Sequence, residues 1–183
     1  RLVVLDVNGV LIARVRGAIT ARPHATDFVR WCLSQADVVL WSSMNRTTLT
    51  FAMTALGVTE RDFLAVLDGS ATIRTQLRPG RIVKMKDPAA ALAAAAAAAA
   101  SITPAPPPHT LDALVYVDDT PSNLPPPSVA AHARPATWRG DPADAELAPG
   151  GVLRAWLGAL VASPLPAPAF ATATPYRGPA AAA

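Results

Sequence analysis

Uninterrupted apolar runs that end abruptly in polar residues recur along this chain. Three segments share the pattern: LVVL at residues 2–5, VVLW at residues 38–41 and LVYV at residues 114–117. Runs of this length, rich in Val and Leu, are typical of strands buried on both faces of a parallel sheet. Because open α/β sheets bind ligands at the carboxyl edge of their strands, the polar residues that follow each run are candidates for a site.

The segments between these runs carry apolar residues at the spacing of a helix. The apolar positions Phe28, Val29, Cys32 and Leu33 predict a helix after the turn-like Gly17. Further segments complete the pattern: a helix between Asn45 as N-cap and Gly57 as stop, short strands within 61–69 and 125–138, and a closing helix at 152–162. This alternation predicts an α/β, Rossmann-like fold with a central, mostly parallel sheet, in which right-handed crossovers bring the strand ends together.

Low-complexity sequence interrupts the pattern between about residues 89 and 108. An alanine run at 89–100 is followed by prolines at 104–108. Alanine favours a helix, but it offers no large apolar side chain, so we expect an insertion that packs poorly. The run is also shorter than the roughly 20 apolar residues of a membrane span. We therefore expect one domain over 1–162, with this insertion, and a Pro/Ala-rich tail over 163–183.

Charge gives no sign of a nucleic-acid partner, and the cysteine content excludes an internal disulfide. The net charge is +3, and the arginines are scattered rather than clustered, so no nucleic-acid partner is indicated. The single cysteine, Cys32, cannot form an internal disulfide, and its place in a helical pattern favours a small buried apolar residue.

The polar strand ends suggest phosphoryl-transfer chemistry. Asp6 follows the first run, Ser42 the second, and the pair Asp118 and Asp119 the third, while Lys86 lies between the last two. A carboxylate can attack phosphorus, a hydroxyl and an ammonium can hold phosphoryl oxygens, and further carboxylates can bind Mg²⁺.

Five segments in this order resemble the haloacid dehalogenase superfamily, in its C-terminal-domain phosphatase-like branch, also called NLI-interacting-factor-like. They are LDVNGVL at 5–11, RPHATDFV at 22–29, VVLWSS at 38–43, KDPAAAL at 86–92 and YVDDTPSN at 116–123. The resemblance implies a three-layer Rossmann-like fold with no large cap domain, a Mg²⁺ ion, and a phosphoprotein or peptide partner inside the cell, in the nucleus or mitochondrion.

The same resemblance implies the roles of individual residues. The catalytic set carried over is Asp6, Asn8, Ser42 and Lys86, with Lys86 preferred to Lys84. The metal ligands carried over are Asp6, Asn8, Asp118 and Asp119.

Asn8 departs from the family pattern. The family has a second aspartate there, which moves protons during catalysis and lends its backbone carbonyl to the metal. An amide keeps the carbonyl but cannot carry the proton, and general acid–base catalysis is typically worth about 10²–10⁴-fold. His24 is a substitute proton carrier by one interpretation and a residue at a helix entrance by another. Val10 replaces the family's threonine and removes one hydroxyl from this loop.

Two functions therefore stay open on this fold. One is a slowed Mg²⁺-dependent protein serine/threonine phosphatase that works through an aspartyl phosphate. The other is a peptide-binding domain with little turnover, similar to the presequence-receptor subunit of the mitochondrial inner-membrane translocase. Phosphoryl transfer on a small metabolite is a third, less favoured because no obvious cap domain is visible. Trp41 and Trp138 are interpreted as core or rim residues, with lining of the substrate mouth as the alternative.

Overall fold

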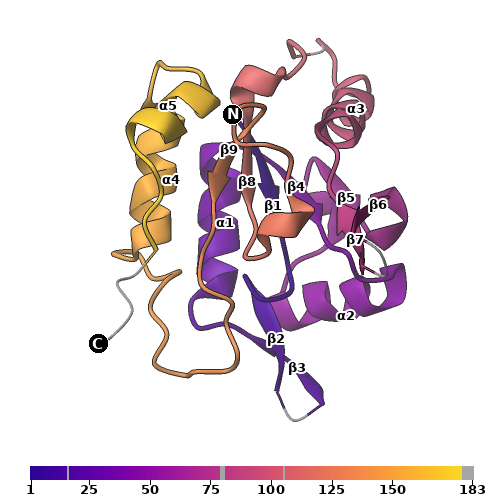
Figure 1. The fold of residues 1–183 in the computed structure, drawn as a ribbon, viewed down its shortest axis with the longest axis vertical. Helices are drawn as coiled ribbons and strands as arrows, with labels where there is room; N and C mark the ends of the chain where they lie inside the picture. The colour runs from indigo at the N-terminus through magenta and orange to yellow at the C-terminus, as the bar shows by residue number, and fades with distance from the viewer. Residues whose placement is uncertain (16, 79–80, 105, 179–183) are drawn as a thin grey trace.

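A central parallel sheet organises the molecule (Figure 1). The computed structural model describes residues 1–15, 17–78, 81–104 and 106–178. The five-stranded sheet has the order β5-β4-β1-β8-β9, and every neighbouring pair is parallel. Its strands are β1 (Leu2–Leu5), β4 (Asp37–Trp41), β5 (Ala65–Leu67), β8 (Leu114–Val117) and β9 (Ala131–Ala133). The α/β, Rossmann-like prediction is confirmed, and the described residues contain no large cap.

The strand register places the predicted polar ends side by side. Leu5 at the end of β1 pairs with Leu40 of β4 on one side and with Val117 of β8 on the other. The residues that follow these strands therefore leave the sheet at the same edge, as the sequence pattern predicted.

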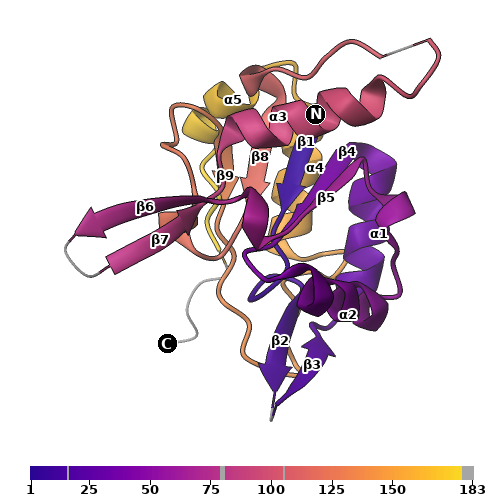
Figure 2. The ribbon, with the colours of Figure 1, turned by 90° about the vertical axis from the view of Figure 1, so that its right-hand side faces the viewer.

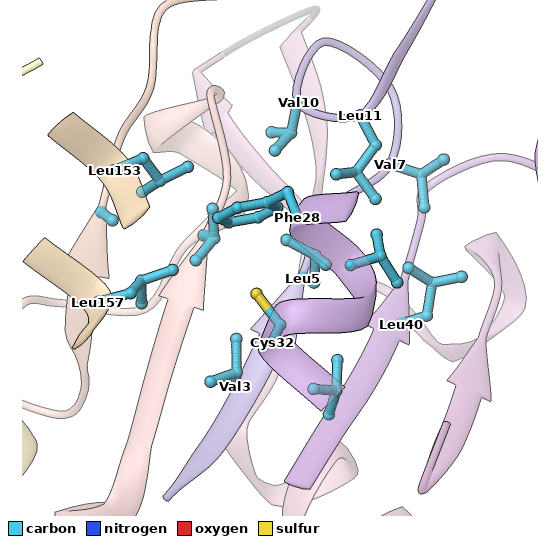
Figure 3. Close-up of a cluster of buried hydrophobic side chains, with 14 of the residues drawn as sticks. Val3, Leu5, Val7, Val10, Leu11, Phe28, Cys32, Leu40, Leu153 and Leu157 are labelled. Atoms are coloured by element: carbon cyan, nitrogen blue, oxygen red, sulfur yellow. The ribbon is translucent and has the colours of Figure 1, made fainter. Parts of the chain in front are cut away.

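One face of the sheet is covered by bulky side chains. Four helices contribute to it: α1 (Ala25–Gln35), α2 (Arg46–Leu56), α4 (Val152–Ala162) and α5 (Ala167–Ala173). Figure 3 shows Phe28 of α1 at the centre of this cluster, between Leu5 of the sheet and Leu153 and Leu157 of α4. We call this the aliphatic face. The predicted caps of α2 are confirmed, because the Asn45 side chain accepts from the Thr48 N–H and Gly57 is left-handed.

The opposite face is covered by the alanine run, which forms α3 (Pro88–Ala99). Ala91 and Ala95 are buried there against a cluster that includes Trp41 and Tyr116 of the sheet. We call this the alanine face. The expectation that the run would pack poorly is wrong, because the strands supply the large buried side chains of this interface and the helix adds small buried ones together with the partly buried Leu92.

Two hairpins extend from this body (Figure 2). The first, β2 (Ile12–Val15) and β3 (Ala18–Ala21), lies between β1 and α1, where the sequence pattern suggested only a glycine turn. The second, β6 (Ile73–Arg78) and β7 (Arg81–Met85), lies between β5 and α3 and was not predicted. Four short 3₁₀ helices complete the fold: Glu60–Asp62, Gly69–Ala71, Leu111–Ala113 and Pro121–Asn123.

The segment after residue 162 was expected to be a tail, but its described part packs on the domain. Phe170 of α5 is buried and meets the Trp156 ring of α4 edge-on, at a centroid distance of 5.7 Å. Trp156 also donates from Nε1 to the Thr174 carbonyl, at 2.7 Å. In the part of the chain that is described, no helix is both long and apolar enough to cross a membrane.

Candidate active site

Asp6 and Asp118 occupy the first positions after two adjacent strands. Side chains alternate between the faces of a strand, so Asp6 shares the face of Val4, and Asp118 shares the face of Tyr116. Both acids therefore emerge toward the alanine face. The Asp6 N–H continues the ladder by donating to the Val117 carbonyl at 2.9 Å, which holds the two acids as neighbours.

Lys86 reaches these acids from the short segment between β7 and α3. Its Nζ donates to Asp6 Oδ1 at 2.6 Å and to Asp118 Oδ2 at 2.7 Å, and the lysine side chain is 1% exposed. The backbone of Lys86 is also held, because its N–H donates to the Asn123 carbonyl at 2.8 Å and its carbonyl accepts from the Tyr116 hydroxyl at 3.3 Å. The packing of α3 on the sheet thus delivers a buried ammonium between two buried carboxylates.

Asp119 completes a cluster of three carboxylates. Asp6, Asp118 and Asp119 each offer an oxygen within 4.8 Å of the other two. Gly9, with a φ of +85°, lies flush against Asp119, and a Cβ at this glycine would come within 2.3 Å of Asp119 Oδ2. Only glycine fits here, because both the backbone conformation and the space exclude a side chain.

Negative charge exceeds positive charge in this cluster. Burial raises the pKa of Asp6 to about 7, and the charges of Asp118 and Asp119 act in the same direction against the opposing effect of Lys86. Burial and Asp118 likewise raise the pKa of Asp119, although Thr137 and Thr120 oppose this. Burial alone would lower the pKa of Lys86, but the two acids it contacts outweigh it and raise that pKa. The cluster is therefore suited to an additional cation.

The hydrogen bonds leave some of the carboxylate oxygens open. Asp118 Oδ1 accepts from the Thr120 N–H at 2.8 Å, and Asp119 Oδ1 is 3.3 Å from the Thr120 hydroxyl that donates to it. Among the described residues, no donor reaches Asp6 Oδ2, whereas Thr137 lies close to the Asp119 carboxylate. Open carboxylate oxygens at this spacing are the kind of ligand that Mg²⁺ prefers.

Ser42 lies at the end of the neighbouring strand β4. Its side chain is buried, and its Oγ accepts from the Met44 N–H at 3.2 Å, so its hydroxyl hydrogen remains available as a donor. The adjacent Ser43 has a different surrounding: its carbonyl accepts from Lys84 Nζ at 2.9 Å. Lys84 therefore fastens β7 to the loop after β4, while Lys86 alone of the lysine pair enters the cluster.

The remaining sequence candidates differ in their surroundings. The Asn8 side chain is exposed, and within the described chain it forms no hydrogen bond. His24 is the exposed N-cap residue of α1, and its charge acts on Asp144. Trp41 is buried in the alanine face, and Trp138 is 5% exposed with Nε1 bonded to the Asp141 carbonyl at 2.8 Å.

Sequence reasoning missed several supporting residues. Thr120 was detectable, because an aspartate two residues before a backbone N–H commonly forms a local turn. Thr137 and the Asn123 carbonyl were not, because only the folded chain brings residues 137 and 123 to the ends of β8 and β7. No protein-family model matches the chain, and a comparison with curated proteins also finds no match.

Proposed function

We propose that this chain is a Mg²⁺-dependent phosphomonoester hydrolase that acts on phosphoserine or phosphothreonine in proteins, through an aspartyl phosphate on Asp6. One observation carries the proposal: a buried lysine binds the two buried carboxylates of Asp6 and Asp118 at the carboxyl edge of a parallel sheet, with the half-buried Asp119 beside them. Ligands of open α/β sheets bind at this edge. The resemblance of the surrounding motifs to the haloacid dehalogenase superfamily supports the same assignment.

The residues present fit a magnesium ion. Asp6, Asp118 and Asp119 supply hard oxygen donors, and their surplus negative charge is otherwise balanced only by Lys86 among the described groups that act on Asp6. Mg²⁺ typically binds one or two carboxylates and completes its shell with water and phosphate oxygens. When bound, it would neutralise phosphate charge and orient the phosphoryl group.

Asp6 is the best placed nucleophile. One oxygen of Asp6 is held by Lys86, whereas no described donor reaches the other, Oδ2. Attack by Oδ2 forms an Asp6–phosphorus bond, breaks the bond from phosphorus to the substrate oxygen, and releases an alcohol after that oxygen gains a proton. Water then cleaves the acyl phosphate to regenerate Asp6 and phosphate. In this proposal, Lys86 and the Ser42 hydroxyl hold phosphoryl oxygens.

Asn8 limits the rate in this proposal. Its exposed amide cannot deliver the proton that the leaving oxygen needs, nor remove one from the attacking water. Without a substitute, we expect turnover about 10²–10⁴-fold below that of a chain with a carboxyl group in this place.

The test is hydrolysis of p-nitrophenyl phosphate with Mg²⁺ by the native chain and matched variants. Asp6→Asn should abolish turnover, Asn8→Asp should raise it, and Lys86→Met should lower it strongly. Asp112→Asn makes the same acid-to-amide change at an exposed position before β8 and should leave turnover unchanged. Lys84→Met is the control for Lys86, because Lys84 donates to the Ser43 carbonyl outside the cluster.

Two results would overturn this proposal. If neither the native chain nor Asn8→Asp hydrolyses the substrate with Mg²⁺, the chain is not a phosphatase of this kind. Turnover that survives Asp6→Asn would exclude an aspartyl phosphate on Asp6.

A second candidate function is a peptide-binding domain with little turnover. The observation that favours it is the β6–β7 hairpin, which pairs with no other strand of the described chain and exposes Ile82 and Ile73. Unpaired strand edges beside exposed apolar residues can accept an extended peptide as an added strand. Ile82→Asp should then weaken capture of labelled extended peptides, whereas Ile102→Asp, at an exposed isoleucine outside the hairpin, should not.

A further inference from the structure

The connection between β9 and α4 reaches back to the loop that follows Asp6. This loop, residues 7–11, is the first-motif loop. The Trp138 N–H from the connection donates to the Gly9 carbonyl at 2.8 Å, and Thr137 lies close enough to Asp119 to lower its pKa. One segment far along the chain therefore contacts both sides of the close approach between Gly9 and Asp119.

Arg22 fastens that connection to the first-motif loop. It is a buried residue directly after β3, in the turn before α1, and its guanidinium binds both carboxylate oxygens of Asp144, each at 2.7 Å. The same guanidinium donates from Nη1 to the Val10 carbonyl at 3.3 Å and to the Ala136 carbonyl at 3.4 Å. A planar, two-pronged pair of this kind fixes direction as well as distance, which a lysine cannot do.

We propose that Arg22 and Asp144 form a latch that holds the first-motif loop in the position that the carboxylate cluster requires, so that Arg22 is a positioning residue. The catalytic consequence rests on the proposed function, whereas the latch itself is a property of the loop. The geometry that carries it is one guanidinium joining the Val10 carbonyl, the Ala136 carbonyl and Asp144.

The loop needs such an anchor on its polar side. Val10 and Leu11 hold its other side by burial in the aliphatic face. The Val10 and Gly9 carbonyls point the other way, where Arg22 and Trp138 supply their hydrogen-bond donors. A shift of Gly9 toward Asp119 would press on the Asp119 carboxylate, because the space between them does not hold even a Cβ atom.

Charge makes the latch a single unit. Asp144 is the ion-pair partner of Arg22 in the described chain, and the Asp144 side chain is 19% exposed against 1% for Arg22. Other ionisable groups face the pair. His24 contributes to lowering the pKa of Asp144. Burial raises the pKa of the Glu146 carboxyl, and Asp144 acts in the same direction, whereas Arg22 opposes it. Removing Asp144 would leave a buried guanidinium without its carboxylate, which is strongly unfavourable.

The test measures amide hydrogen exchange, which does not depend on turnover. In Asp144→Asn and Arg22→Lys, the amides of Gly9, Leu11 and Trp138 should exchange at least about tenfold faster, because charge-assisted hydrogen bonds are lost. The amides of Val4 and Leu5 in β1 should keep their native rates. Glu60→Gln, which breaks the exposed Arg46–Glu60 pair, is the control and should change none of these rates.

A double variant separates positioning from stability alone. Arg22→Met combined with Asp144→Leu replaces the ion pair by apolar side chains, a change that often preserves global stability. The latch predicts that the first-motif loop still exchanges fast in this variant, although the melting temperature recovers. Native exchange of the loop in both this variant and Asp144→Asn would overturn the proposal, as would an equal rise at Val4 and Leu5.

Hydrolysis adds the catalytic arm of the same experiment. If the native chain turns over p-nitrophenyl phosphate, Asp144→Asn and Arg22→Lys should each lower kcat about tenfold or more with little change in KM. If the native chain shows no turnover, the phosphatase proposal fails, and hydrogen exchange still decides whether the latch exists.

Discussion

The two faces of the sheet are covered in opposite ways. On the aliphatic face, helices supply the bulk: Phe28, Leu153 and Leu157 fill the space above small and medium strand residues. On the alanine face, the strands supply the bulk through Trp41 and Tyr116, and α3 contributes buried methyl groups and the partly buried Leu92. A helix of small residues can approach a sheet closely, and this approach brings Lys86 to the acids at the strand ends. The alanine run thus supports the candidate site instead of interrupting the domain.

The largest effect is expected on the aliphatic face. Phe28→Ala removes a fully buried ring, and a large-to-small change of this kind typically costs about 3–5 kcal/mol in the free energy of unfolding. Phe51→Ala is the matched control, since Phe51 of α2 is 62% exposed, and it should cost little. Urea denaturation of both variants measures the difference. Equal losses would mean that burial does not distinguish the two rings.

An intermediate effect should come from enlarging a methyl group on the alanine face. Ala91→Leu overfills a buried position, which typically costs about 1–3 kcal/mol, whereas Ala93→Leu on the exposed side should be nearly neutral. Because Lys86 immediately precedes this helix, Ala91→Leu should also reduce any phosphatase turnover. Thermal denaturation compares the two variants, and a stable Ala91→Leu chain would show that α3 does not pack as closely as described.

The smallest effect should separate one tryptophan on each face. Trp41 Nε1 is buried and has no hydrogen-bond partner among the described residues, whereas Trp156 Nε1 donates to the Thr174 carbonyl at 2.7 Å. Trp156→Phe should therefore cost about 1 kcal/mol more than Trp41→Phe, the typical net value of one hydrogen bond. Guanidinium denaturation monitored by circular dichroism measures both. A larger loss in Trp41→Phe would point to a partner for its indole N–H.

Much of the fold followed from local pattern. The strands β1, β4 and β8 were predicted from short apolar runs rich in Val and Leu. The caps of α2 were predicted from Asn45 and Gly57. Both kinds of signal lie within a few residues of the chain. The β2–β3 and β6–β7 hairpins were missed. The first was interpreted as a glycine turn before α1. The second exposes the apolar residues Ile73 and Ile82, so it lacks the buried apolar run by which the other strands were predicted.

The candidate site shows the same division. Asp6, Asp118 and Asp119 were predicted to meet, because parallel strands carry their ends to one edge, and the structure brings them within 4.8 Å. Their catalytic and metal-binding roles stay predictions, as does the role of Asn8, whose side chain is exposed.

The sequence by itself determined the strands, their polar ends and the order in which those ends follow one another, since each depends on residues close together in the chain. Tertiary structure alone decided that an alanine helix covers a sheet face, that residues after 162 pack on α4, and that Arg22 meets Asp144. These contacts join segments as far apart as 122 residues, and their energy comes from shape and charge complementarity that no local pattern records.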